Sequence, residues 1–399
     1  MIENSKFCVI GVGGAGCRII SHLVREPGAE YLKLIAIDTD RNGLAECGLD
    51  EEHTILAGEK WRNGRGTGGR VIDGQSAFSP ERRRIEEMIK GSQMLIICGG
   101  LGGGTASGGI PIVLSCASNM QIPAVTVLSQ PFAVEGLQRQ RISEQAMNNE
   151  IIRIADAAIL IPNDLLFAGL DPATPLAEAF QLADREMARS VLALSTILCA
   201  GNLLNADFSD FSALLRRKKS HCALGIGVID TANEGSFTAE KAFEKLLESP
   251  LLGGASTLCD ADAVIFTLTG GPELSLSDAR SVFAISTSHI GKKTSVLVGA
   301  AVDEKWRGKF QYTALAVNYE KEALPAGSQG TERKKSKRQS RLELSDGDMI
   351  QQTLPLSENE FSRGIMEKTT PVRWNGEELD IPTFLRKNQV IDTGKDQLS

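Results

Sequence analysis

The chain has 399 residues, of which 42% are hydrophobic, and a formal net charge of −7 at pH 7. This length predicts two hydrophobic cores with appendages. The acidic balance argues against a nucleic-acid-binding protein, which would present a basic face, and no stretch is long and apolar enough to span a bilayer. The eight cysteines form no Cys-x-x-Cys pair. They favour buried thiols in a reducing cytoplasm over disulfides or a metal site.

The first region alternates strands and helices. Apolar, β-rich runs predict strands at Phe7–Ile10, Leu32–Ile37, Met94–Cys98, Ala124–Leu128 and Ala157–Ile161. Helical periodicity predicts helices at Cys17–Arg25, Pro80–Lys90 and Gln138–Ala155. Such alternation is typical of a doubly wound parallel sheet. Its ligand is expected at the carboxyl ends of the strands.

Glycine-rich turns follow two of these strands. One is Gly11-Val-Gly-Gly-Ala-Gly16, and the other runs from Gly99 to Gly109. Glycine lets backbone N–H groups close around a phosphate without side-chain obstruction. The N-terminus of the following helix adds partial positive charge. Two such loops in one domain predict a nucleotide held from two sides, and a third stretch, Gly64–Gly69, is expected to be a flexible loop.

The first loop alone favours a different class of protein. Gly11, Gly13 and Gly16 match the dinucleotide spacing, and Asp38 ends the second strand, where a ribose-binding acid is expected. The second loop counts against an NAD-dependent enzyme, because dinucleotide folds need no further glycine loop after a later strand. Neither loop contains a lysine, which excludes a Walker-type P-loop.

A long helix divides the chain. Thr174 is the expected N-cap and Pro175 the first helical residue, while Gly201 ends the run. Apolar residues recur at helical spacing at Leu176, Phe180, Ala183, Met187, Val191, Leu194 and Leu198.

A second α/β region follows the helix. Its strands are expected at Ala223–Val228, Ala263–Leu268, Ser295–Ala301 and Thr313–Val317, and its helices at Ala239–Glu248 and Leu276–Ser286. Residues 321–373 are polar and lack periodicity, which predicts a disordered linker.

Several ordered segments together resemble the tubulin/FtsZ family, and most closely its FtsZ branch. They are Gly11–Gly16, Gly102–Gly108, Pro131–Arg139, Ile161–Asp164, Glu178–Asp184, Asn205–Asp210, Ser249–Leu252 and Thr269–Leu274. The resemblance implies a Rossmann-like parallel-sheet GTPase domain, joined by a long central helix to a second α/β domain. A linker and a C-terminal peptide follow.

The resemblance implies GTP or GDP as the ligand, with Mg²⁺ carried by the nucleotide phosphates rather than by side chains. The phosphate loops are expected to use Gly13, Gly14, Ala15, Gly16, Cys17, Arg18, Gly102, Gly103, Gly104, Thr105, Ala106, Ser107 and Gly108. Glu135 and Arg139 are expected at ribose and phosphate, and Asp38 is included in the site.

Asn163, Phe180 and Asp184 are the expected base-binding residues. Guanine offers two adjacent donors, N1–H and the 2-amino group, which one carboxylate can accept, whereas adenine offers no such pair. Phe180 lies one helical turn before Asp184 and can stack on the base. Without the resemblance, Phe180 would be read as core and Asp184 as a solvated acid.

The segment with Asn205, Asp207 and Asp210 preserves the N-x-D-x-x-D pattern of the family. On sequence alone these acids indicate only a helix start. The resemblance implies that they enter the nucleotide site of the next subunit and position the attacking water. Hydrolysis would then require assembly, and a head-to-tail contact that does not close generates filaments.

The chain departs from the usual FtsZ pattern at a few positions. Cys17 and Arg18 stand in place of Gly-Asn, Asp38 in place of Asn, and Ala106 in place of Gly. Ala106 fits only if its φ is negative. The alternative function is therefore an FtsZ-like structural filament with weak or no hydrolysis. An NAD-dependent oxidoreductase is a more distant third possibility.

The end of the chain resembles the family's peptide for membrane-tethering adaptors, with Leu379–Arg386 as the contact. Ile381, Phe384 and Leu385 are its apolar anchors. The resemblance implies a cytoplasmic division-ring scaffold at the inner face of the cell membrane in bacterial cytokinesis, with no membrane insertion. The expected division of the chain is a GTP-binding domain (1–173), central helix (174–201), second α/β domain (202–318), linker (319–373) and tail (374–399).

Overall fold

The structure is a computed structural model that describes residues 6–26, 28–167, 170–171, 173–199, 208–216, 220–319, 373–374 and 377–378. The chain divides into two compact units, Met1–Ala326 and Gly327–Ser399. In the second unit, β11 (Arg373–Trp374) pairs with β12 (Glu377–Glu378) in antiparallel fashion. The rest of the expected linker and tail, including the adaptor peptide Leu379–Arg386, lies outside the described residues.

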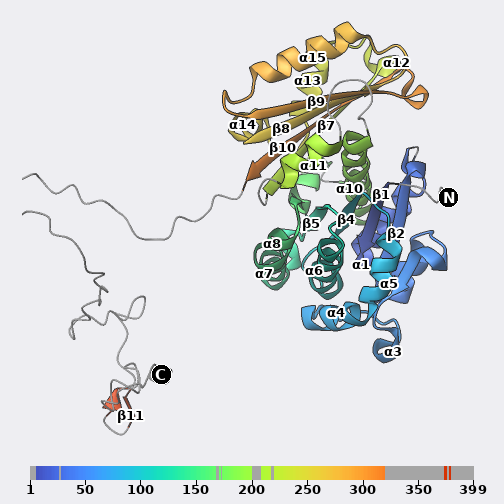
Figure 1. The fold of residues 1–399 in the computed structure, drawn as a ribbon, viewed down its shortest axis with the longest axis vertical. Helices are drawn as coiled ribbons and strands as arrows, with labels where there is room; N and C mark the ends of the chain where they lie inside the picture. Colours follow the sequence, from blue (N-terminus) through green and yellow to red (C-terminus); the bar gives the residue numbers. More distant parts are fainter. Residues whose placement is uncertain are drawn as a thin grey trace, which may run out of the picture. The chain divides into compact units, whose positions relative to one another are not determined.

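A ten-stranded sheet runs through the first unit in the order β3-β2-β1-β4-β5-β6-β7-β10-β8-β9. Its first six strands are β1 (Phe7–Val12), β2 (Leu32–Asp38), β3 (Thr54–Leu56), β4 (Met94–Gly100), β5 (Ala124–Gln130) and β6 (Ala157–Pro162). The others are β7 (Ser220–Asp230), β8 (Ala263–Gly270), β9 (Ser295–Val302) and β10 (Lys309–Tyr319). The predicted α/β class, with two α/β regions and a long helix between them, is confirmed (Figure 1).

The two regions share this one sheet, which the sequence did not indicate. β6 pairs in parallel with β7 from Ala157↔Ser220 to Ile159↔Cys222. β10 is antiparallel to both β7 and β8, and β8 is parallel to β9. A pairing of only three residues, between strands that flank the long helix, leaves no pattern in the sequence of either strand.

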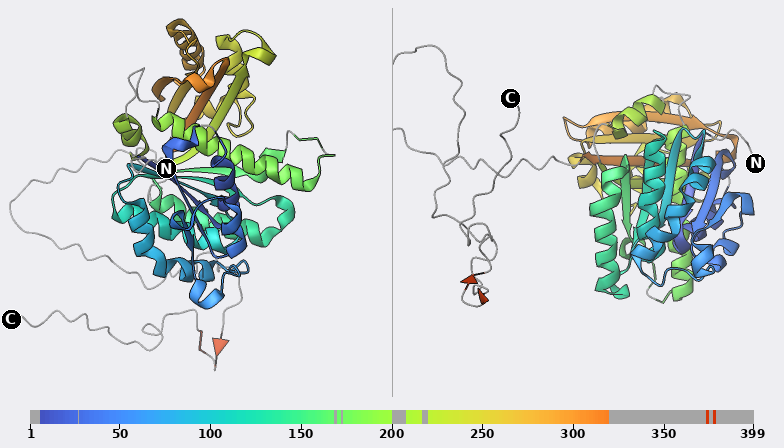
Figure 2. Two further views of the ribbon diagram at one scale, coloured as in Figure 1. Left: turned by 90° about the vertical axis from the view of Figure 1, so that its right-hand side faces the viewer. Right: turned by 60° about the horizontal axis from the view of Figure 1, so that its bottom comes forward.

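Helices cover both faces of the first six strands. One face packs on α1 (Gly13–Leu23) and α10 (Leu176–Cys199). The other packs on α4 (Val71–Phe78), α5 (Arg82–Ile89), α6 (Gly104–Asn119), α7 (Leu137–Ala146) and α8 (Ile152–Ile154) (Figures 1 and 2). In β1, Val9 points into the first core, and Cys8 and Ile10 into the second. Burial on both faces explains why these strands read as continuous apolar runs.

The second region has a core of its own. α13 (Ala239–Leu247) and α15 (Leu276–Ser288) pack on one face of β7, β8 and β10, around Phe243, Phe266 and Tyr312. The opposite face contributes Leu224 and Leu315 to the core that holds α10. α10 thus packs between the two regions, as Figure 2 shows in its left view. Short helices α12 (Thr231–Glu234) and α14 (Ala255–Asp260) complete this part.

Some predicted boundaries were wrong. α1 begins at Gly13 rather than Cys17, because Gly13 turns the chain at φ +72° directly after β1. The helix expected over 138–155 contains a π-helical segment, Met147–Ile151, between α7 and α8. Residues 41–79, where only the loop Gly64–Gly69 was expected, contain β3 and the short helices α2 (Arg41–Glu46) and α3 (Glu59–Arg62), followed by α4.

Candidate functional site

A cavity of about 460 Å³ lies at the carboxyl ends of β1, β4, β5 and β6, where the two glycine loops meet. The expected site residues that line it are Gly13, Gly14, Ala15, Arg18, Gly103, Gly104, Thr105, Ala106, Glu135, Arg139, Asn163, Phe180 and Asp184. Expected residues that do not line it are Gly16, Cys17, Asp38, Gly102, Ser107, Gly108 and Asp210. The position agrees with the general rule for ligands of parallel sheets.

The first glycine loop presents open backbone to this cavity. A Cβ added at Gly14 would have only Arg18 Nη1 within 4 Å, at 3.7 Å. Gly16 has a different role, since its Cβ would lie 2.7 Å from the carbonyl carbon of Gly11. Gly16 therefore lets α1 pack closely on β1, whereas Gly14 is exposed at the start of the helix.

The second loop combines an open position with closely packed ones. A Cβ at Gly103 would meet nothing within 4 Å. At Gly104 it would lie 2.5 Å from the carbonyl oxygen of Arg70, and at Gly108 it would lie 2.4 Å from that of Val71. These two glycines allow α6 to pack against the start of α4. Ser107 holds the loop in shape, because its Oγ accepts the N–H of Gly102 at 3.0 Å.

Ala106 fits the loop without strain. Ala106 is a buried residue of α6, and its φ is not positive. The condition set by the sequence for an alanine at this position is therefore met.

Three threonine hydroxyls converge beside the glycine loops. Thr39 Oγ1 and Thr105 Oγ1 share a hydrogen bond of 2.6 Å, and Thr67 Oγ1 lies 3.5 Å from Thr105 Oγ1. Thr67 belongs to the third glycine stretch, Gly64–Gly69, and lines the cavity together with Gly69. Sequence reasoning missed Thr39 and Thr67. A hydroxyl flanked by glycines was the available signal for Thr67.

Charged side chains from two helices form the other end of the cavity. Arg18 of α1 donates from Nε to Asp184 Oδ2 of α10 at 2.7 Å. The Asp184 side chain is 13% exposed and that of Arg18 is 49% exposed. The expected base-binding carboxylate is therefore already in contact with one of the residues that departs from the usual FtsZ pattern.

Phe180 occupies the same end. Its ring contacts those of Phe132 and Phe167 edge to face, with centroids 5.5 and 5.7 Å apart. It nevertheless stays 38% exposed and lines the cavity. Phe180 is thus anchored in an aromatic cluster and leaves apolar surface toward a ligand.

Glu135 and Arg139 also line the cavity. Arg139 Nη1 donates to Glu135 Oε2 at 2.6 Å, and Glu135 Oε1 accepts the N–H of Phe132 at 3.0 Å. Asn163 begins α9 (Asn163–Phe167), directly after β6, and also faces the cavity. The structure brings these residues together from three separate segments.

Asp38 lies below the cavity rather than in it. It is 2% exposed, and its Oδ1 accepts the N–H of Thr39 at 2.7 Å and that of Asp40 at 3.3 Å. The Cys17 thiol lies 3.9 Å from its Oδ2. Burial raises the pKa of Asp38 to about 6, and burial together with Asp38 raises the pKa of Cys17.

Of the expected catalytic residues, Asp210 alone lies among the described ones, and it does not line the cavity. Asn205 and Asp207 lie outside the described residues, and Asp210 is an exposed residue of α11 (Phe208–Arg216). α11 follows α10 in the chain. At 1.5 Å per residue, the C-terminal end of α10 lies about 22 Å from Asp184 along the helix axis.

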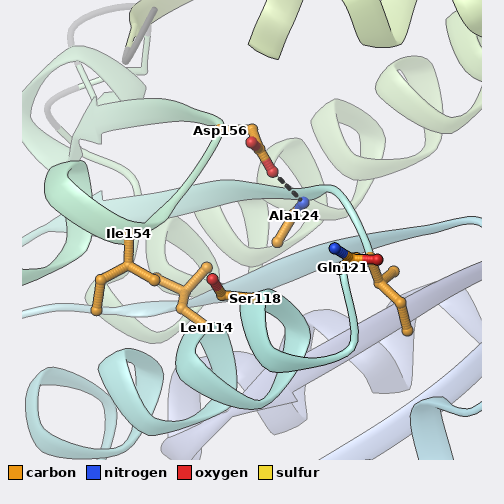
Figure 3. A pocket seen from close by; sticks show the side chains of 7 residues that line it. Leu114, Ser118, Gln121, Ala124, Ile154 and Asp156 are labelled. Atoms are coloured by element: carbon orange, nitrogen blue, oxygen red, sulfur yellow. Dashed lines mark hydrogen bonds between the residues drawn. The ribbon is translucent and has the colours of Figure 1, made fainter.

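Another hollow, of about 420 Å³, lies near Ala124, the first residue of β5. Figure 3 shows the residues that line it. Asp156 there accepts the N–H of Ala124 at 2.8 Å. This hydrogen bond fixes the first residue of β5. No group of three or more His, Cys, Asp or Glu that could hold a metal occurs in the described part of the chain.

Comparisons with known proteins agree with this geometry. The model of the tubulin/FtsZ family GTPase domain matches residues 6–171, and that of the FtsZ family C-terminal domain matches residues 221–320. No helix of the described residues is long and apolar enough to cross a membrane.

Solved structures show the same fold. An empty FtsZ dimer from M. jannaschii is 28% identical with a TM-score of 0.69, over 82% of this chain and 95% of the other. A single-residue mutant of M. jannaschii FtsZ is 30% identical with a TM-score of 0.69, over 79% of this chain and 92% of the other. A GTPγS-bound protofilament of CetZ2 from Haloferax volcanii is 22% identical with a TM-score of 0.61, over 78% and 92%.

Proposed function

We propose that this chain, which belongs to the tubulin/FtsZ family, binds GTP and polymerises head to tail into filaments that hydrolyse GTP at the contacts between subunits. One observation carries the proposal: the two glycine loops, Glu135, Arg139, Asn163, Phe180 and Asp184 line one cavity, while Asp210 does not. Among the described residues, a single subunit therefore has the parts of a nucleotide site, while Asp210 lies outside its cavity.

The proposed assignment of roles follows the cavity from end to end. Backbone N–H groups at Gly13, Gly14 and Gly103 bind the phosphates, since a glycine has no side chain of its own to obstruct them. Glu135 and Arg139 serve the ribose and phosphates. Asn163, Phe180 and Asp184 bind the guanine.

Mg²⁺ fits the donors beside the phosphate loops. Thr39, Thr67 and Thr105 offer hydroxyls, and Mg²⁺ commonly binds phosphate oxygens, water and hard oxygen ligands. Thr67 and Thr105 line the cavity and would face the ion, which would neutralise charge on the phosphates.

The proposed hydrolysis needs a water placed in line with the terminal phosphate. We assign this task to Asp207 and Asp210 of the next subunit, with Asn205 beside them. The products are GDP and phosphate. Because the cavity and the acids belong to opposite ends of α10, each contact is heterologous and leaves a free end, which makes a filament.

The first test compares GTP, GDP, ATP and NAD in pelleting and phosphate release. The proposal predicts pelleting and phosphate release with GTP alone. GTP-dependent pelleting without phosphate release would favour the alternative, a structural filament with weak or no hydrolysis. Equal responses to ATP and GTP would contradict the assignment.

A mixing experiment tests the shared site. Asp210→Ala keeps the cavity, and Gly103→Asp keeps the acids while placing a negative charge where phosphates are expected. Gly103 has φ −94° and no atom within 4 Å of an added Cβ, so the fold tolerates the change. Each variant alone should lack hydrolysis, whereas an equimolar co-polymer should recover activity at about one quarter of its contacts. Proven co-assembly without recovery would contradict the shared site.

We further propose that the filament is a scaffold of the bacterial division ring at the inner face of the cell membrane, recruited through Leu379–Arg386. Ile381, Phe384 and Leu385 are the proposed anchors in an adaptor groove. Phe384→Ala should abolish localisation to the division site while the purified protein still polymerises. Normal localisation of the variant, or loss of polymerisation, would contradict this role of the tail.

A further inference from the structure

The contact between Arg18 and Asp184 gives the cavity an ordered row of hydrogen-bonding groups. Arg18 uses Nε for Asp184 Oδ2. Its two terminal nitrogens form no hydrogen bond with the described residues, and its side chain is 49% exposed in the cavity. A guanidinium is a rigid planar fork, so a terminal N–H group stands beside the nitrogen that contacts the carboxylate.

A terminal N–H of Arg18 together with the two oxygens of Asp184 would offer a ligand the pattern donor, acceptor, acceptor. The edge of guanine reads acceptor, donor, donor, from O6 through N1–H to the 2-amino group. The two rows are complementary. Each carboxylate oxygen has a lone pair left for guanine, because among the described residues Asp184 accepts one hydrogen bond, from Arg18.

Adenine has the opposite group at the first position. Its 6-amino group is a donor and would face the Arg18 donor, while N1 would face a carboxylate without a hydrogen between them. A ligand that covers these hydrogen-bonding groups without pairing them is disfavoured, because the groups then lose their hydrogen bonds to water.

We propose that Arg18 is a specificity-determining residue that donates a hydrogen bond to guanine O6, acting beside Asp184 as one reader of the base. The inference rests on the proposed GTP-binding function. It separates the tasks within the pair: Arg18 reads O6, and Asp184 reads N1–H and the 2-amino group. Phe180 holds the base in their plane by contact with its ring face.

The test measures equilibrium binding of GTP, 6-thio-GTP and ITP to the full chain. 6-Thio-GTP keeps N1–H and the 2-amino group but replaces O6 by sulfur, a weak acceptor, whereas ITP lacks the 2-amino group alone. The parent should bind 6-thio-GTP about tenfold more weakly than GTP. In Arg18→Met this ratio should fall to about one, while the ratio of GTP to ITP stays as in the parent.

Asp184→Ala provides the reciprocal result, with the GTP to ITP ratio falling to about one. Arg189→Met is the matched control. Arg189 lies on the same helix as Asp184, pairs with Glu186 at 2.8 Å and stays outside the cavity, so its removal should leave every ratio unchanged.

The outcomes separate this inference from the proposed function. A parent protein that binds no GTP contradicts the proposed function itself. GTP binding with an unchanged 6-thio-GTP ratio in Arg18→Met overturns the inference alone. A uniform loss for all three nucleotides also overturns it, because Arg18 would then serve the phosphates or only hold Asp184 in place.

Discussion

The two ends of the cavity present different chemical groups, backbone at one end and charged side chains at the other. At the phosphate end, Gly14 and Gly103 present backbone, and an added Cβ would have within 4 Å only Arg18 Nη1 at Gly14 and no atom at Gly103. At the base end, Arg18 and Asp184 present charged side chains from helices far apart in the chain. Backbone N–H groups bind any phosphate chain alike, whereas the row of charged groups distinguishes one purine from another.

The difference teaches where affinity and selectivity reside in this molecule. The phosphate end should accept every nucleoside triphosphate, and the base end should choose among them. Substitutions at one end should therefore leave the property of the other unchanged. Each of the following changes tests that separation.

The largest effect is expected for Asp184→Ala. Asp184→Ala removes the carboxylate proposed to accept guanine N1–H and the 2-amino group, and a hydrogen bond to a charged group contributes about 1.5–3 kcal/mol. GTP affinity should fall about 100-fold, while the weak affinities for ATP and inorganic tripolyphosphate change little. Competition binding measures all three, with thermal unfolding as the check on the fold. Equal losses for GTP and tripolyphosphate would break the comparison.

Asp38→Asn probes the one buried acid described close to the phosphate end. The pKa of Asp38 is raised from 3.8 to about 6 by burial, so the native state holds its proton more tightly than the unfolded chain does. Asp38 therefore contributes stability that is fully present below pH 3.8 and is lost as the pH rises through about 6. An asparagine cannot ionise, so Asp38→Asn does not lose stability in this way. Its free energy of unfolding should exceed that of the parent by up to about 3 kcal/mol at pH 8.

Denaturant unfolding between pH 4 and pH 8 measures the difference between Asp38→Asn and the parent. The difference should grow with pH and level off above about 6. A difference that is constant across this range would show that Asp38 carries no raised pKa.

Adjacent glycines offer a matched pair at the phosphate end. Gly104→Ala places a methyl 2.5 Å from the carbonyl oxygen of Arg70 and should lower the free energy of unfolding by about 1–3 kcal/mol. Gly103→Ala meets no atom and should stay within about 0.5 kcal/mol of the parent. In binding, Gly103→Ala should weaken GTP and ATP by the same factor. A factor specific to GTP would contradict the separation of the two ends.

The smallest effect is expected for Glu135→Gln. Its partner Arg139 is 58% exposed, and exposed ion pairs contribute at most about 1 kcal/mol. The glutamine oxygen can still accept the N–H of Phe132. GTP affinity, measured by titration, should change less than about fivefold. A larger change would show that Glu135 binds the ribose more strongly than this geometry indicates.

Local patterns carried much of the fold. The strand expected at Phe7–Ile10 is β1, and the glycine loops occur where strand, turn and helix signals follow one another. Such signals are short-range, so a single sequence contains them. The break of the expected helix at Met147–Ile151 was missed, because a π-helical segment keeps the same composition as its neighbours.

Long-range contacts could not be read in the same way. The hydrogen bond of Arg18 with Asp184 spans 166 positions, and that of Thr39 with Thr105 spans 66. The pairing of β6 with β7 likewise depends on how the chain returns after α10. These contacts depend on how whole helices and strands pack together, and no residue spacing in the sequence predicts that packing.

The central claim is that GTP hydrolysis belongs to the contact between subunits. Phosphate release per subunit, measured with GTP over a range of protein concentrations alongside pelleting, tests it most directly. The account predicts almost no turnover below the concentration at which filaments form and a rising rate per subunit above it. A rate per subunit that is the same at all concentrations, with or without filaments, would contradict the account.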